Sequence, residues 1–118
     1  MELWLNPACQ KCRVAVAELD AAGIEYTVRR YLDDPPDEAT LREVVARLGL
    51  EPWDIARDKE TREEGLDIPR DAEHRADWFA ALAAHPRIIQ RPIITAADGT
   101  TVVGRDSDSL GRIIAAES

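Results

Sequence analysis

The first 32 residues, MELWLNPACQKCRVAVAELDAAGIEYTVRRYL (1–32), contain the most informative structural pattern of the chain. The apolar run Glu2–Asn6 ends at an Asn-Pro turn and is typical of a buried strand. Gln10–Ala22 is rich in Ala, Val, Leu and Glu and stops at a glycine, which predicts a helix. Ile24–Leu32 then predicts a second strand. A strand, a helix and a strand in this order form a βαβ unit, whose two strands are parallel.

The middle of the chain predicts a helical region. Asp37 follows a Pro-Pro break and can cap a helix that ends at Gly49, because apolar side chains recur there at helical spacing. These side chains are Leu41, Val44, Val45 and Leu48. A further helix is expected over Arg75–Ala84, where Pro86 closes it. Between the two, the charged stretch Asp58–Asp67 predicts a mobile surface segment.

The last third of the chain predicts a hairpin and a helix. Pro92–Ala96 and Thr101–Val103 flank Asp98-Gly99, a strong hairpin signal, and Leu110, Ile113 and Ile114 mark an amphipathic helix. The predicted order is βα β ααα ββα. This is an α/β, thioredoxin-like fold with a helical insertion between the second and third strands, and we expect one domain over residues 1–118.

Composition limits the classes of function. With 118 residues, 45% hydrophobic and 32% charged, the chain is typical of a soluble globular domain. Its start lacks the pattern of a signal peptide and no apolar run approaches a membrane span, so we expect a cytoplasmic protein. The net charge of −8 disfavours nucleic-acid and membrane partners, and an anionic substrate would need a local cluster of cations. We expect a monomer.

The two cysteines carry the strongest chemical signal. Cys9 is predicted at a helix N-terminus, where free backbone N–H groups and the helix dipole favour a thiolate, and Lys11 and Arg13 add positive charge. Cys12 lies one turn later and can reach back to Cys9. This spacing indicates a nucleophilic thiolate with a resolving thiol that can close a disulfide.

Two other interpretations of the pair are open. An inert buried pair is disfavoured because the flanking residues are polar or turn-forming. A zinc site would need two more ligands, and the candidates His74 and His85 lack the usual ligand spacing. We therefore expect no metal.

Three segments resemble one known family. Asn6-Pro7-Ala8-Cys9-x-x-Cys12-Arg13 resembles the loop that enters the first helix in the arsenate reductase family (ArsC), which includes the redox-sensing Spx regulators. The resemblance continues at 49–57 (GLEPWDIAR) and 89–94 (IIQRPI), followed by Gly99 and Arg105. It covers essentially the whole chain.

The resemblance implies roles for individual residues. Cys9 corresponds to the catalytic cysteine, and Arg57, Arg91 and Arg105 correspond to the arginines that hold the arsenate oxyanion. Guanidinium groups bind tetrahedral oxyanions in forks, although each arginine taken alone would be assigned to a surface ion pair. The resemblance also implies a cis Arg91–Pro92 bond beside the Cys9 loop. Supporting residues would be Asn6, Pro7, Lys11, Arg13 and Pro92.

Two positions depart from the enterobacterial type of arsenate reductase. Leu5 stands where those enzymes carry a histidine, so activation of the thiolate must rest on the helix end and nearby cations. Cys12 stands where they carry a serine, and the resulting CxxC is the pattern of the Spx branch.

The expected function is reduction of arsenate or a similar small oxyanion by Cys9, with Cys12 or an external thiol resolving the adduct. No cofactor is expected to be bound. The reductant would be a glutaredoxin-like or thioredoxin-like partner or a low-molecular-weight thiol. Two alternatives stay open, which are an Spx-like redox sensor that binds a transcription partner and a general CxxC disulfide reductase.

Overall fold

The computed structural model describes residues 1–117, and backbone contacts divide the chain into two compact units. One unit consists of Met1–Asp34 together with the segment that starts at Arg91, and the other is Pro35–Gln90. The second unit is the helical insertion that the sequence predicts between the second and third strands. The expected single domain over the whole chain stays a prediction.

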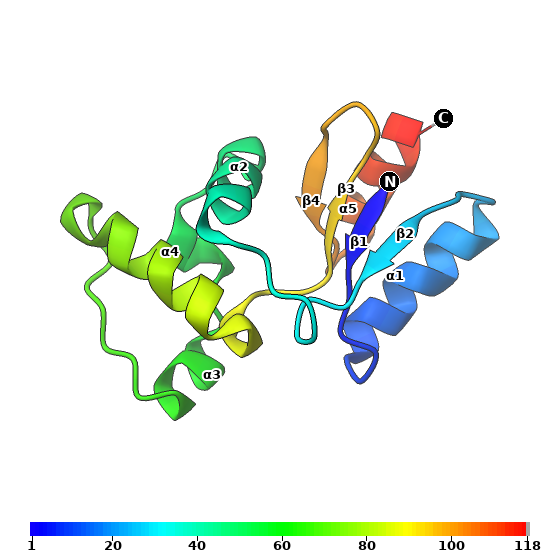
Figure 1. The fold of residues 1–118 in the computed structure, drawn as a ribbon. Helices are drawn as coiled ribbons and strands as arrows, with labels where there is room; N and C mark the ends of the chain where they lie inside the picture. Colours follow the sequence, from blue (N-terminus) through cyan, green and yellow to red (C-terminus); the bar gives the residue numbers. More distant parts are fainter. Residues whose placement is uncertain (118) are drawn as a thin grey trace. The chain divides into compact units, whose positions relative to one another are not determined.

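The first unit contains a four-stranded mixed sheet and two helices (Figure 1). Its elements are β1 (Glu2–Trp4), α1 (Gln10–Ala21), β2 (Thr27–Arg29), β3 (Ile93–Thr95), β4 (Thr101–Val103) and α5 (Ser107–Glu117). The strands lie in the order β2-β1-β3-β4, with β1 parallel to β2 and antiparallel to β3, and with β3 antiparallel to β4. The predicted βαβ unit and the predicted hairpin are both confirmed.

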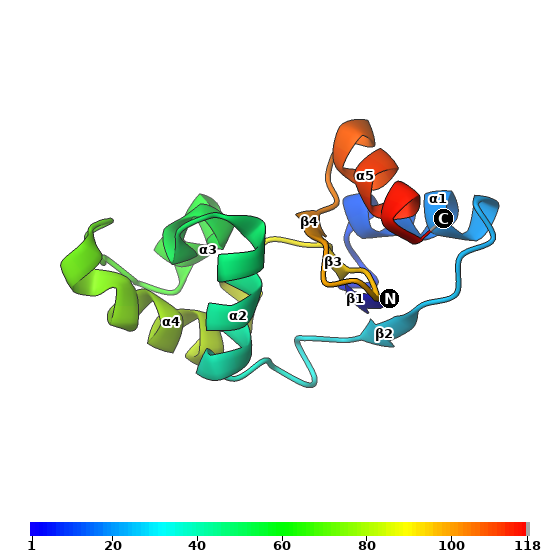
Figure 2. The ribbon, with the colours of Figure 1, turned by 90° about the horizontal axis from the view of Figure 1, so that it is seen from above.

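Helices α1 and α5 cover the same face of this sheet (Figure 2). Leu3, Ile94 and Val102 are register partners across β1, β3 and β4 and belong to one buried core. The helices contribute the other buried members, which are Ala15, Leu19, Leu110 and Ile113. Full burial of a leucine, isoleucine or valine side chain stabilises a fold by about 1.5–3 kcal/mol, so this core holds α1 and α5 against the sheet.

Strand β2 is shorter than the predicted Ile24–Leu32. The Ile24 N–H donates to the Leu19 carbonyl at the end of α1, and the Arg30 carbonyl accepts from the N–H groups of Asp33 and Asp34. Because a backbone group used in a cap or a turn cannot join a strand ladder, only the three residues of β2 pair with β1.

The second unit contains α2 (Glu38–Leu48), α3 (Asp58–Glu63) and α4 (Arg75–Ala84), joined by short 3₁₀ turns. The Asp37 carboxylate accepts a 2.8 Å hydrogen bond from the Thr40 N–H, and Gly49 ends α2 with φ of 67°, so both predicted caps are confirmed. Helices α2 and α4 contact each other, with the Arg42 guanidinium carbon 4.4 Å from the centre of the Phe79 ring.

The mobile surface segment predicted for Asp58–Asp67 is wrong over its first six residues, which form α3. The Arg57 Nε donates a 3.0 Å hydrogen bond to the Glu60 carboxylate, and the Thr61 hydroxyl donates one of 2.7 Å to the Arg57 carbonyl. Glu60 and Thr61 are both buried. A charged sequence therefore forms a helix here because one of its faces is covered.

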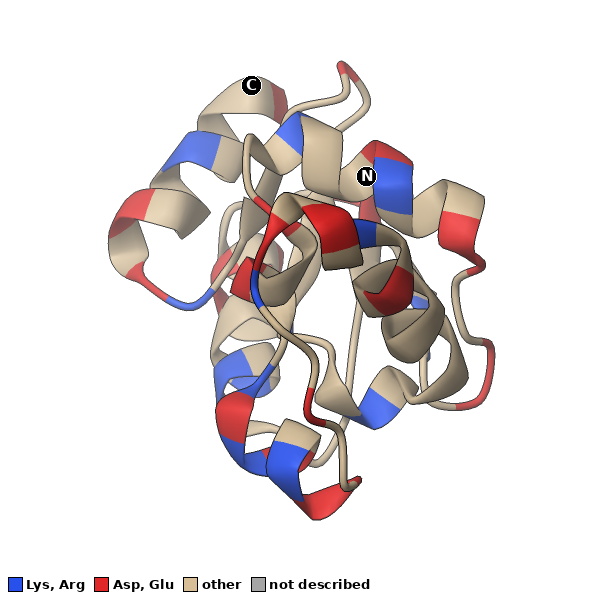
Figure 3. Ribbon diagram, turned by 90° about the vertical axis from the view of Figure 1, so that its left-hand side faces the viewer, with Lys and Arg blue, Asp and Glu red and all other residues tan. Residues whose placement is uncertain are grey.

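Acidic and basic residues intermingle along the chain (Figure 3). Several are joined in ion pairs inside the second unit, such as Arg75 with Glu51 at 2.7 Å and Arg87 with Glu63 at 2.5 Å. Within residues 1–117, no helix is both long and apolar enough to span a bilayer.

Candidate active site

The loop between β1 and α1 places the first cysteine. The Asn6 side-chain carbonyl accepts a 3.0 Å hydrogen bond from the Ala8 N–H, and the Asn6 backbone carbonyl accepts one of 3.0 Å from the Cys9 N–H. Cys9 is the N-cap of α1, and its carbonyl accepts the first helical bond from the Arg13 N–H. Asn6 thus shapes the turn that delivers Cys9 to the helix end.

The Cys9 thiol is half-buried and surrounded by donors. Burial has the largest single effect on its pKa and raises it. Hydrogen bonds from the Cys12 N–H, the Arg91 guanidinium, the Cys12 thiol and the Lys11 N–H act in the opposite direction and together bring the pKa of Cys9 down to about 7. Near neutral pH a large fraction of Cys9 is therefore thiolate, the nucleophilic form.

Cys12 is fully buried one turn inside α1. Its burial, together with the charge and the hydrogen bond of Cys9, raises the pKa of Cys12 to about 11, although the Asn6 N–H and the charge of Arg91 act to lower it. The pair therefore divides into an accessible thiolate and an enclosed thiol.

Arg91 reaches the cysteine loop by way of the sheet. The Arg91–Pro92 bond is cis, as the resemblance implies, and Ile93 pairs with Trp4 at the end of β1. The residues before β3 consequently lie beside the loop that follows β1, and the Arg91 guanidinium donates a hydrogen bond to the Cys9 sulfur. The Nε of Arg91 is buried without a hydrogen-bond partner among the described residues.

Arg105 lies on the same side of the site. Its Nη1 donates a 2.7 Å hydrogen bond to the Arg91 backbone carbonyl. The preceding residue, Gly104, donates from its N–H to the Pro92 carbonyl at 2.9 Å, and a Cβ there would lie 2.7 Å from the Ile94 Cδ1. A side chain at position 104 would therefore force the Ile94 side chain to shift beside the segment that brings Arg105 to Arg91. The sequence contains no signal for this contact.

Arg57 belongs to the other unit. It precedes α3, and its guanidinium pairs with the carboxylate of the buried Glu60. Its predicted place at the cysteine site stays a prediction. Arg13 is exposed on α1, and its contribution to the thiolate also stays a prediction.

The two histidines lie beside carboxylates in the second unit. His74 Nδ1 lies 2.5 Å from an Asp71 carboxylate oxygen, and His85 Nδ1 lies 3.5 Å from one of Glu64. Among residues 1–117, no cluster of three or more His, Cys, Asp or Glu side chains could hold a metal ion.

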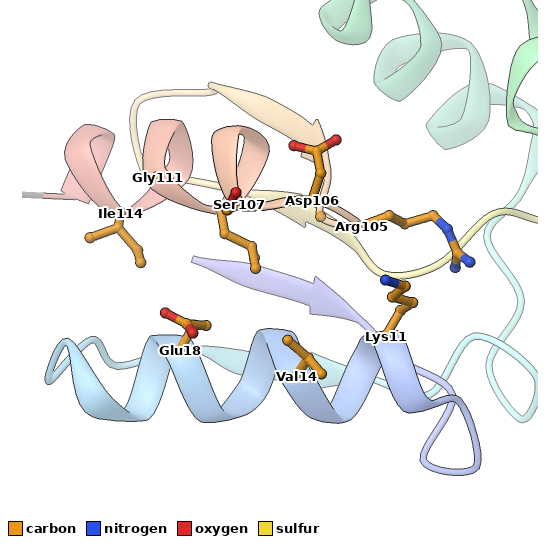
Figure 4. A pocket seen from close by; sticks show the side chains of 10 residues that line it. Lys11, Val14, Glu18, Arg105, Asp106, Ser107, Gly111 and Ile114 are labelled. Carbon is orange, nitrogen blue, oxygen red and sulfur yellow. The ribbon is translucent and has the colours of Figure 1, made fainter.

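A groove of about 310 Å³ runs between α1 and the start of α5 (Figure 4). Lys11 and Arg105 lie at the same end of it, the end at which α1 begins, and Glu18 lies farther along α1. Val14, Leu110 and Ile114 give the groove an apolar lining. Sequence reasoning did not find this groove, because its two walls are separated by some ninety residues of chain.

Comparison with known proteins decides the family. Residues 4–113 match the family model described as the ArsC family. The chain belongs to the ArsC family. It is 34% identical to an arsenate reductase of Neisseria meningitidis over 97% of both chains. It is also 58% identical to a Streptomyces viridochromogenes protein named "Uncharacterized protein in glnII region", over 93% of this chain and 95% of that one.

Structural comparison agrees with the ArsC family assignment. A solved structure named arsenate reductase from Vibrio cholerae aligns with a TM-score of 0.73 and 28% sequence identity, covering 98% of this chain and 97% of that one. Both the family resemblance and the thioredoxin-like α/β fold predicted from the sequence are confirmed. The roles of individual residues at the ArsC site stay predictions.

Proposed function

We propose that this protein is a thiol-dependent reductase of arsenate or a similar small oxyanion, with Cys9 as its nucleophile. The observation that carries the proposal is the environment of the Cys9 sulfur. It receives hydrogen bonds from two backbone N–H groups of α1 and from the Arg91 guanidinium, and its pKa falls to about 7. Membership of the ArsC family and relatives named arsenate reductase support the same chemistry.

Arginine side chains supply the anion site in this proposal. The Arg91 guanidinium is already beside Cys9, and Arg105 is bonded to the Arg91 backbone, so both are within one small region. Planar guanidinium groups bind tetrahedral oxyanions through paired N–H donors. Arg57 is assigned to the anion site only by family resemblance. To bind the anion, Arg57 would have to break its ion pair with Glu60 or contact Glu60 and the anion at the same time.

The reaction proceeds in two steps. The Cys9 thiolate first attacks arsenic, forming an As–S bond while one As–O bond breaks and the oxygen leaves as water after protonation. A second thiolate then attacks the Cys9 sulfur, the As–S bond breaks, and its electron pair stays on arsenic, which becomes trivalent. Arsenite and a disulfide are the products, and the two thiols have supplied the two electrons.

The second thiol is Cys12 or an external one. Cys12 is already in hydrogen-bond contact with Cys9, and its proton must leave as it attacks. The resulting Cys9–Cys12 disulfide would be reduced by a glutaredoxin-like or thioredoxin-like protein, whereas a small external thiol would leave a mixed disulfide on Cys9. No bound cofactor is needed for either route.

The test is arsenate-dependent formation of arsenite by the purified protein, measured directly as trivalent arsenic with each class of reductant supplied in turn. The proposal expects turnover that disappears in Cys9→Ser. Cys12→Ser separates the two routes, because it retains turnover only where an external thiol resolves the adduct. No arsenite from the wild-type protein with any of the reductants would reject the proposal.

A redox sensor is the second candidate, and the enclosed Cys12 favours it. A buried thiol beneath an accessible thiolate is suited to closing an internal disulfide after oxidation by peroxide. A sensor would form this disulfide readily and show no arsenate turnover. A general disulfide reductase would instead turn over protein disulfides without any dependence on arsenate.

A further inference from the structure

The two sulfurs of Cys9 and Cys12 form one compact ligand pair. Cys9 is the N-cap of α1 and Cys12 is the third residue of that helix, so the two side chains lie one turn apart at the same helix end, where the Cys12 thiol hydrogen-bonds to the Cys9 sulfur. Both cysteines are free thiols. The loop and the first turn of α1 therefore hold two soft sulfur ligands next to each other before any ligand arrives.

Two adjacent thiols suit a particular chemical class. Trivalent arsenic is soft and exchanges its oxygen ligands for thiolates, and it needs only three bonds in all. A pair of thiols and one remaining hydroxyl or carbon substituent satisfy it completely. A structural zinc ion would need four protein ligands, and no group of three or more candidate ligands occurs among residues 1–117.

We propose that the reduced Cys9–Cys12 pair captures trivalent arsenicals, with one arsenic atom bonded to both sulfurs. With arsenite, two As–O bonds break, two As–S bonds form and two water molecules leave. Arsenic stays trivalent and no electrons are transferred, so no oxidant or reductant is required. This capture is a binding function of the dithiol and does not depend on arsenate reduction.

The different burial of the two cysteines determines which As–S bond forms first. Cys9 is half-buried and reachable, whereas Cys12 has no exposed surface, so arsenic reaches Cys12 only after it has bonded to Cys9. The second bond then closes within one protein molecule. A linked second contact strengthens binding by about 10²–10⁴-fold when the geometry permits both contacts at once.

Capture has a consequence for the proposed reductase. The Cys9–Cys12 disulfide has no thiol to offer, so arsenite leaves the oxidised protein freely. After reduction, the dithiol becomes a ligand for the arsenite it has released. Arsenite would then compete with arsenate for the reduced form.

The test uses phenylarsine oxide, which exchanges its single oxygen for two thiols with release of one water. The protein is kept reduced with a phosphine, because a dithiol reductant would itself bind the probe. Free thiols and intact mass are measured as the probe is added. We expect wild type to lose both thiols on binding one arsenic, and to recover them with 2,3-dimercaptopropanol but not with an equal concentration of a monothiol.

Single-cysteine variants complete the experiment. Cys12→Ser should bind the probe at least about a hundredfold more weakly, and Cys9→Ser should not bind it over the same concentration range. Thermal unfolding of each variant checks that it is folded. Loss of only one thiol in the wild type, or reversal of its adduct by the monothiol, would overturn the proposal even if a variant failed to fold.

Discussion

Arg105 holds the backbone of Arg91, through a 2.7 Å hydrogen bond from its Nη1 to the Arg91 carbonyl. The side chain of Arg91 in turn donates to the Cys9 sulfur. Arg105, which follows β4, is thereby linked to the Cys9 thiolate through Arg91. Arg105 is therefore a positioning residue for Arg91.

Replacing Arg105 should therefore change the thiol as well as turnover. Arg105→Ala removes the bond to the Arg91 carbonyl, and we expect a higher Cys9 pKa and arsenate turnover lowered by about tenfold or more, since a hydrogen bond from a charged group contributes about 1.5–3 kcal/mol. Arg105→Lys keeps a charged donor and should partly restore both the low pKa of Cys9 and the arsenate turnover. The readout is the pH profile of Cys9 alkylation beside the turnover rate, and an unchanged profile in Arg105→Ala would refute the positioning role.

Alkylation should distinguish the two cysteines. Cys9, with its pKa lowered to about 7, should react in the native protein with a midpoint near neutral pH, whereas Cys12, buried and with its pKa raised to about 11, should stay unmodified until the protein is unfolded. Peptide mapping after timed treatment with iodoacetamide measures both. Equal labelling of the two cysteines with the pH dependence of an ordinary thiol would contradict the site described above.

Stability should depend on pH through Cys9. Its pKa is lower in the folded chain than the usual value of 9.0, so between about pH 7 and 9 the unfolded chain binds more protons than the folded chain, and the free energy of unfolding rises with pH. This contribution is lost as the pH falls through 7. Denaturant unfolding under reducing conditions should show a smaller rise across this window for Cys9→Ser than for wild type.

Two glycines give a matched test of the packing that places Arg105. At Gly104 a Cβ would lie 2.7 Å from the Ile94 Cδ1 and 3.3 Å from the Leu110 Cδ2, so Gly104→Ala should destabilise the fold by about 1–3 kcal/mol. At Gly111, within α5, a Cβ meets nothing within 4 Å, and Gly111→Ala should stabilise the helix by up to about 1 kcal/mol. Opposite signs are expected in thermal melts, and equal effects would count against this packing.

Much of the fold could be predicted because its signals are local. The Asn-Pro turn before Cys9, the cap at Asp37 and the Asp98-Gly99 turn each act on residues next to them in the chain, so sequence spacing is enough to place them. The extent of β2 and the helix α3 could not be predicted in this way. Strand β2 is cut short by backbone bonds in the α1 cap and in the turn after Arg30, which the residue types do not reveal, and α3 depends on the burial of Glu60 and Thr61.

The candidate site, like the fold, has features that local sequence predicts and features that it does not. The helix-end position of Cys9 and the lowered pKa of its thiol follow from the predicted helix N-terminus, whereas the raised pKa of Cys12 comes first from its burial, which the spacing does not show. Arg91 came from family resemblance, since nothing local links residue 91 to residue 9. The hydrogen bond from Arg105 to the Arg91 carbonyl had no sequence signal. Every residue has a backbone carbonyl, and the sequence does not show which one a distant side chain will reach.

In the proposed function Arg91 and Cys9 together reduce an oxyanion, and Arg91→Ala separates this chemistry from simple oxidation of the thiols. We measure arsenite formation from arsenate and, separately, formation of the Cys9–Cys12 disulfide with peroxide, in wild type and in Arg91→Ala. We expect arsenate turnover to fall by about ten- to a hundredfold in the variant, with the disulfide still forming. Wild-type turnover that Arg91→Ala leaves unchanged, or no wild-type turnover while the disulfide forms readily, would contradict the proposed function.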